Sequence, residues 1–148
     1  MMCGGTGVVH TGVMTERSEH SEPAQHQRTP IELVGVYHAD GGVVGELRYV
    51  LGKARGTAHC ALCDITHGTV RRKSAWDAAC RDYDVPIRLV HLNERSAIEV
   101  AACTLGTPTV LAHYDDDTWQ AILGPDELEL HGSVPAFFSA VDRALART

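Results

Sequence analysis

From Pro30 onward, short apolar runs alternate with segments whose apolar residues recur at helical spacing, and this order constrains the fold more than any other feature. Residues 31–37 form an almost continuous apolar run, which is typical of a strand covered on both faces. The polar turn 38–42 leads into residues 43–53, where apolar residues recur every three or four positions. A strand, a turn and a helix make the first half of a β-α-β unit.

The middle of the chain predicts a second buried strand at 87–92, with helices at 71–83 and 94–105 on either side of it. Asn93 is the expected N-cap of the later helix. Apolar residues at helical spacing should form the buried faces of the two helices. They are Trp76, Ala79, Cys80 and Tyr83 in the first, and Ile98, Ala101, Ala102 and Leu105 in the second.

The last third of the chain predicts a hairpin and a closing helix. Residues 107–114 and 119–123 read as antiparallel strands joined by an acidic turn. Ser133 should cap the last helix, with a proline in its first turn. The side chains expected to be buried are Phe138, Val141 and Leu145. The whole order predicts an α/β sandwich.

Two cysteines flanked by histidines form the strongest chemical signal. The segment His59 to His67 reads His-Cys-Ala-Leu-Cys-Asp-Ile-Thr-His. On a helix, Cys60, Cys63 and His67 would fall at i, i+3 and i+7 on one face, so both sulfurs can meet at one point. Dithiol redox chemistry and zinc ligation both need that geometry.

Composition predicts one domain in an acidic chain. Residues 1–29 have no apolar period and read as a disordered leader, residues 30–148 as the domain, and Met14 as a second plausible start. The net charge of −6, with a single basic run at 71–73, argues against nucleic-acid binding. No apolar stretch is long enough to cross a membrane, and no export signal precedes the domain. A cytoplasmic protein with reduced thiols is expected.

The order of elements resembles the thioredoxin-like fold over residues 30–147. The most specific residues are Thr107-Pro108-Thr109-Val110, which look like the loop of that family in which a cis proline precedes a core strand. The resemblance implies that Thr107 and Pro108 bind substrate and face the turn that begins at His38.

The chain departs from that family in the position of its cysteines. The family's redox pair lies at the start of the first helix, whereas Cys60 and Cys63 lie in a segment, 55–84, that looks inserted after that helix and carries an extra helix. The chain is also similar to uncharacterised bacterial proteins with matching residues at 37–41 and 60–66. That second similarity implies no function.

The first functional hypothesis is dithiol redox activity. One thiolate would attack a protein disulfide, and the other would resolve the mixed disulfide. If Cys60 and Cys63 fold back beside Pro108, His38 would carry protons near neutral pH and Asp40 would orient it.

The second hypothesis is a structural zinc site without catalysis, and the third is an inert cysteine pair in a protein-binding module. The zinc ligands would be Cys60, Cys63 and His67, with His59 or a more distant histidine as a fourth. Because His59 and Cys60 are adjacent, both cannot easily point inward from one helix. The sequence leaves the three readings open.

Overall fold

The computed structural model describes residues 27–41, 60–68 and 71–148. The predictions for residues 1–26, for the helix at 43–53 and for the ligand His59 fall outside these residues. The strands are β1 (Pro30–Val36), β2 (Ile87–Val90), β3 (Thr109–Tyr114) and β4 (Trp119–Leu123). The helices are α2 (Ala61–Thr66), α3 (Ser74–Asp82), α4 (Ala97–Ala102) and α5 (Val134–Leu145), with a 3-10 turn, η1, at Leu92–Glu94.

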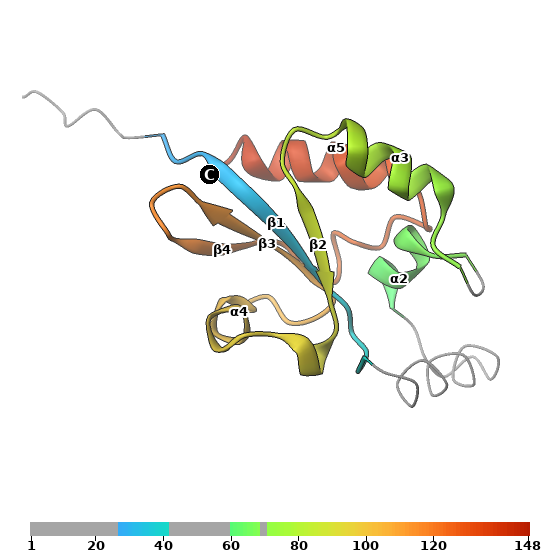
Figure 1. Ribbon diagram of the computed structural model, residues 1–148, viewed down its shortest axis with the longest axis horizontal. Coiled ribbons are helices and arrows are strands. Elements are labelled where there is room, and N and C mark those ends of the chain that lie inside the picture. The colour runs from blue at the N-terminus through green and yellow to red at the C-terminus, as the bar shows by residue number, and fades with distance from the viewer. Residues whose placement is uncertain (1–26, 42–59, 69–70) are drawn as a thin grey trace, which may run out of the picture.

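The four strands form one mixed sheet in the order β2-β1-β3-β4. Strand β1 pairs in parallel with β2 and antiparallel with β3, and β3 and β4 form the expected antiparallel hairpin. Helices lie on both sides of this sheet, with α3 and α5 together on one side and α4 on the other (Figure 1). The α/β class is confirmed.

Alternation along β1 divides the core between the two faces of the sheet. Leu33 and Tyr37 belong to the larger cluster, with residues of α2, α3 and α5, whereas Val34 and Val36 belong to a smaller cluster beside α4. A strand buried on both faces needs a continuous apolar run, which is the pattern that predicted β1.

Aromatic side chains join α3 to α5. The Trp76 ring, 2% exposed, lies 5.0 Å from the Phe137 ring, and Tyr83 donates a 2.7 Å hydrogen bond to Asp142. The predicted stripe of α3 is confirmed, because Ala79, Cys80 and Tyr83 pack against the same cluster. In α5, Ser133 is the N-cap, as predicted. The fully buried phenylalanine is Phe137, and Phe138 is only partly buried.

The prediction for α4 was wrong in its start and in its buried face. Ser96, not Asn93, is the N-cap, and the predicted core residues Ile98 and Leu105 are 50% and 48% exposed. A capping box sets the start of the helix, because Ser96 and Glu99 bond each other's backbone N–H. Arg88 of β2 also pairs with Glu99 and holds this carboxylate inward, which turns the apolar side of the short helix outward.

Two distant parts of the chain meet on one aromatic ring at the far end of the sheet. The Arg28 guanidinium lies 4.4 Å from the centre of the Tyr114 ring, and the Tyr114 hydroxyl donates a 2.9 Å hydrogen bond to Thr148. The C-terminus accordingly lies beside the start of β1 (Figure 1). None of the helices in the described part of the chain is long and apolar enough to span a membrane.

Candidate functional site

Cys60 and Cys63 are joined by a disulfide across the first turn of α2, with their Cα atoms 5.2 Å apart. Cys60 is the N-cap of this helix, and its sulfur accepts a hydrogen bond from the backbone N–H of Cys63 at 3.4 Å. Cys60 is 1% exposed and Cys63 is 8% exposed. The sequence therefore brings both sulfurs together at a helix start, and Cys63 is the more accessible residue.

Helix α2 is held against the sheet by its apolar residues. Leu62 and Ile65 are fully buried in the larger core cluster. A Cβ atom at Gly35 of β1 would lie 3.2 Å from Leu62 Cδ2 and 2.7 Å from Leu89 Cδ2. The glycine thus lets α2 lie close to the sheet, so the disulfide is attached to the core rather than to a surface loop.

A hydroxyl at the end of α2 connects the disulfide helix to β1. Thr66 is fully buried, and its hydroxyl donates to the Leu62 carbonyl at 3.1 Å. Its oxygen also lies 2.9 Å from the Tyr37 hydroxyl and 2.7 Å from His67 Nδ1. The Thr66 hydroxyl therefore joins α2 both to the end of β1 and to His67.

Consecutive residues at the end of β1 reach two different parts of the site. Tyr37 contacts α2 through Thr66, whereas His38 Nδ1 lies 2.8 Å from Thr107 Oγ1. The Thr107–Pro108 peptide bond is cis, as expected, and Pro108 is buried. Two residues proposed for the site, His38 and Thr107, are thus brought together.

Asp40 does not orient His38 in the structure. Its side chain is exposed and makes no hydrogen bond or ion pair with any other described residue. The neighbouring Gly41 is held instead, because its N–H donates to Asn93 Oδ1 at 2.7 Å and its carbonyl accepts from Asn93 Nδ2 at 3.2 Å. Asn93, predicted as a helix cap, fixes the loop that follows β1.

The end of β2 adds a second imidazole beside Tyr37. The His91 ring lies 5.0 Å from the Tyr37 ring, and the His67 ring lies 6.0 Å from it. Glu94 accepts hydrogen bonds from both the backbone N–H and Nδ1 of His91, at 2.8 and 2.9 Å. These bonds, the backbone one first, lower the pKa of Glu94. A carboxylate therefore stays ionised next to this ring.

The described residues provide no ready zinc site. Among residues 27–41, 60–68 and 71–148, no group of three or more His, Cys, Asp or Glu side chains could hold a metal ion. Cys60 and Cys63 use their sulfurs for each other, and His67 bonds Thr66 through Nδ1. The proposed fourth ligand, His59, lies outside the described residues, so the zinc reading stays a prediction.

Sequence reasoning missed the polar residues that connect the parts of this site. Tyr37 was interpreted as the end of an apolar run and Thr66 as part of the cysteine segment, and neither was assigned a role in the site. Thr66 could have been identified from the sequence, because it lies in an apolar segment expected to be buried, and a buried hydroxyl needs a hydrogen-bond partner.

Comparisons with models of protein families, with curated proteins and with solved structures find no match for the chain. The site is therefore interpreted from its own geometry.

Proposed function

We propose that the protein carries out thiol–disulfide exchange at Cys60 and Cys63. The observation that carries the proposal is the disulfide between these two residues at the start of α2. A pair joined across one turn can open and close without moving the rest of the helix. Sulfurs bonded to each other are not zinc ligands, so this geometry favours redox chemistry over a structural zinc site.

A thioredoxin-like frame is part of the same proposal. Three features support it: the sheet order β2-β1-β3-β4, the parallel pairing of β1 with β2, and a cis proline directly before β3. His38 and Thr107 would line the partner's path beside that proline, since they are hydrogen-bonded to each other there. The cysteines occupy α2, so the proposal assigns catalysis to a displaced pair.

The geometry assigns different roles to the two sulfurs. A thiolate of a partner protein attacks the sulfur of Cys63, the more exposed residue of the pair, and the S–S bond breaks with its electron pair remaining on Cys60. The Cys63 N–H, which already bonds the Cys60 sulfur, stabilises that thiolate. A second partner thiolate then attacks the mixed disulfide and displaces Cys63. The partner leaves as a disulfide, and both cysteines are reduced.

Thiol counting with metal analysis tests this proposal. The protein, purified without oxygen, should contain no stoichiometric zinc and should lose two thiols reversibly in a glutathione redox buffer, both mapping to Cys60 and Cys63. One equivalent of zinc that protects both thiols would overturn the redox function in favour of a structural metal site. A pair that resists millimolar dithiothreitol in the folded protein would also overturn it.

Single-cysteine variants test the assigned roles. With oxidised glutathione, Cys60→Ser should accumulate a mixed disulfide on Cys63 faster than Cys63→Ser does on Cys60. Cys80 provides an internal reference, because burial raises the pKa of its thiol and slows its reaction. Equal rates for the two variants would contradict the assigned order of attack.

A further inference from the structure

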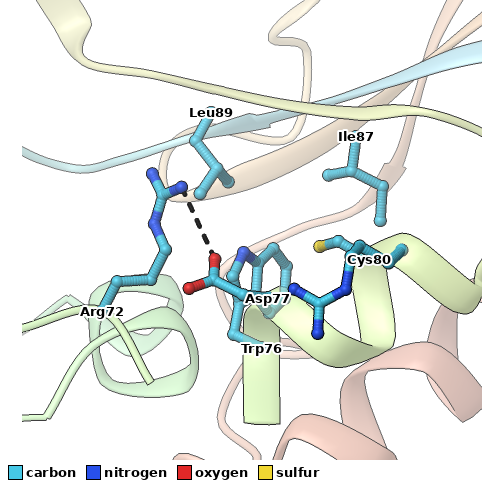
Figure 2. A pocket seen from close by; sticks show the side chains of 7 residues that line it. Arg72, Trp76, Asp77, Cys80, Ile87 and Leu89 are labelled. Atoms are coloured by element: carbon cyan, nitrogen blue, oxygen red, sulfur yellow. Dashed lines mark ion pairs between the residues drawn. The ribbon is translucent and has the colours of Figure 1, made fainter. Parts of the chain in front are cut away.

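Beside the edge strand β2 lies a groove that plays no part in the proposed redox chemistry. It has a volume of about 420 Å³, and we call it the edge groove. Residues of α3, with Arg72 just before it, line one side of the groove, and the side chains of Ile87 and Leu89 line the other (Figure 2). The lining residues are Arg72, Trp76, Asp77, Cys80, Arg81, Ile87 and Leu89.

The backbone of β2 is paired on one side only. The carbonyls of Pro86 and Val90 accept 2.9 Å hydrogen bonds from the backbone N–H groups of Leu33 in β1 and of Tyr37 just after it. Because backbone groups alternate between the two edges of a strand, those of Ile87 and Leu89 point away from β1. No strand pairs with that outer edge in the part of the chain that the structure describes. It can therefore accept an added strand.

The groove is positively charged in a chain whose net charge is −6. Arg72 and Asp77 form an ion pair at 3.7 Å, with both side chains about half exposed. Arg81 is exposed and has no ionic partner among the described residues. One cationic charge is thus left over in the groove. The side chains of a strand point alternately to the two faces of the sheet. Every second side chain of an added strand would therefore point toward the groove.

We propose that the edge groove binds an extended acidic peptide segment of a partner protein, added as a strand to β2. Carboxylates at alternate positions would face Arg72 and Arg81, while the backbone bonds Ile87 and Leu89. A second copy of the chain fits less well, since it would bring a second pair of arginines to the same place. Strand β2 is also only four residues long, which suits a short peptide better than an extended sheet.

The probe is a synthetic hexapeptide in which glutamate alternates with threonine, and its binding is measured by calorimetry and by its effect on cysteine alkylation. Saturable binding should weaken as salt is added. The peptide should slow alkylation of Cys80 in the groove but not of Cys103, the other free cysteine of the described chain. The same peptide with lysine in place of glutamate should not bind.

Two sets of variants separate the charge from the backbone contribution. Arg81→Ala should weaken binding by roughly two- to fivefold, as expected for an exposed charge pair, whereas Arg143→Ala on α5 should leave it unchanged. The N–H groups of an extended peptide alternate between its two edges. Two peptides are therefore compared, each N-methylated at the positions of one edge. Only the peptide whose methylated edge faces β2 should lose affinity.

Three results would overturn the proposal: equal binding of both N-methylated peptides, no protection of Cys80, or a dimer that forms through β2 and excludes the peptide.

Discussion

Helices α2 and α4 are each six residues long, but they bury opposite kinds of side chain. In α2 nearly every residue is buried, and the apolar Leu62 and Ile65 hold it to the sheet. In α4 the one buried residue is the carboxylate Glu99, while Ile98 is half exposed. A short helix is thus oriented by its strongest anchor, which is apolar packing in α2 and an ion pair in α4.

The largest effect should come from the apolar anchor of α2. Leu62→Ala leaves a cavity between α2 and the sheet, and we expect the free energy of unfolding to fall by about 2–5 kcal/mol. Urea denaturation with the disulfide intact measures this loss. Val100→Ala on the exposed side of α4 is the control. A loss for Leu62→Ala no larger than the control's would show that α2 is not anchored by packing.

The carboxylate anchor of α4 should give the next largest effect. Arg88 bonds Glu99 from β2, and the Ser96 N–H donates to it at 2.7 Å. Glu99→Gln removes the charged acceptor, so we expect a loss of about 1.5–3 kcal/mol at neutral pH. Denaturation of both proteins at pH 7 measures the difference. Wild-type stability in the variant would mean that Glu99 does not hold α4.

The same pair of proteins should report the ionisation of Glu99. Burial by itself raises the pKa of Glu99, but hydrogen bonds from Arg88 and Ser96 outweigh it and lower that pKa below its ordinary value of 4.5. A lowered pKa stabilises the folded state above the ordinary value, and the gain is lost as pH falls through the folded pKa. The stability difference between wild type and Glu99→Gln should therefore shrink below pH 4.5. A difference independent of pH would contradict this assignment.

The polar anchor of α2 should contribute less than either. Thr66→Val keeps the shape of the side chain but removes the oxygen that bonds Tyr37, His67 and the Leu62 carbonyl, so we expect a loss of about 0.5–1.5 kcal/mol. Tyr37→Phe removes only the bond between Tyr37 and Thr66 and is the matched control. Calorimetric melting of both variants measures the effect. If the two lose equally, the other bonds of Thr66 contribute nothing.

The smallest effect should come from the outer face of α4. Ile98→Ser replaces a side chain that is 50% exposed, so we expect the free energy of unfolding to change by no more than about 0.5 kcal/mol. Denaturation beside Leu62→Ala gives the comparison directly. A loss above 2 kcal/mol would mean that this face is covered in solution.

Periodicity predicted the elements whose apolar face is their anchor. Strand β1, the hairpin and α5 were all predicted because burial of apolar side chains sets their position. The prediction from apolar spacing failed in α4, where a polar contact decides the orientation. The start of α4 could have been predicted, because Ser96-Ala97-Ile98-Glu99 has the sequence of a capping box. Within α5 both Phe137 and Phe138 contact Trp76, and Phe137 is the fully buried one because it shares the buried side of the helix with Val134, Val141 and Ala144.

The candidate site was predictable in its cysteines and not in its connections. The spacing of Cys60 and Cys63 predicted that both sulfurs can meet at one point, but reduced thiols were expected, and the structure joins the two residues by a disulfide. The contacts of Tyr37 with Thr66 and of His38 with Thr107 join residues 29 and 69 positions apart. Such contacts depend on how the elements pack, which alternation and spacing do not encode.

The Tyr114 ring, which holds both Arg28 and Thr148, has a practical consequence for engineering. Since Arg28 and Thr148 lie against one side chain, a short linker could join these two positions in a circular permutant. For the same reason, a fusion partner or surface anchor attached at Thr148 would sit beside the start of β1, away from the disulfide helix (Figure 1). The domain could thus be tethered through its C-terminus with α2 on the side away from the support.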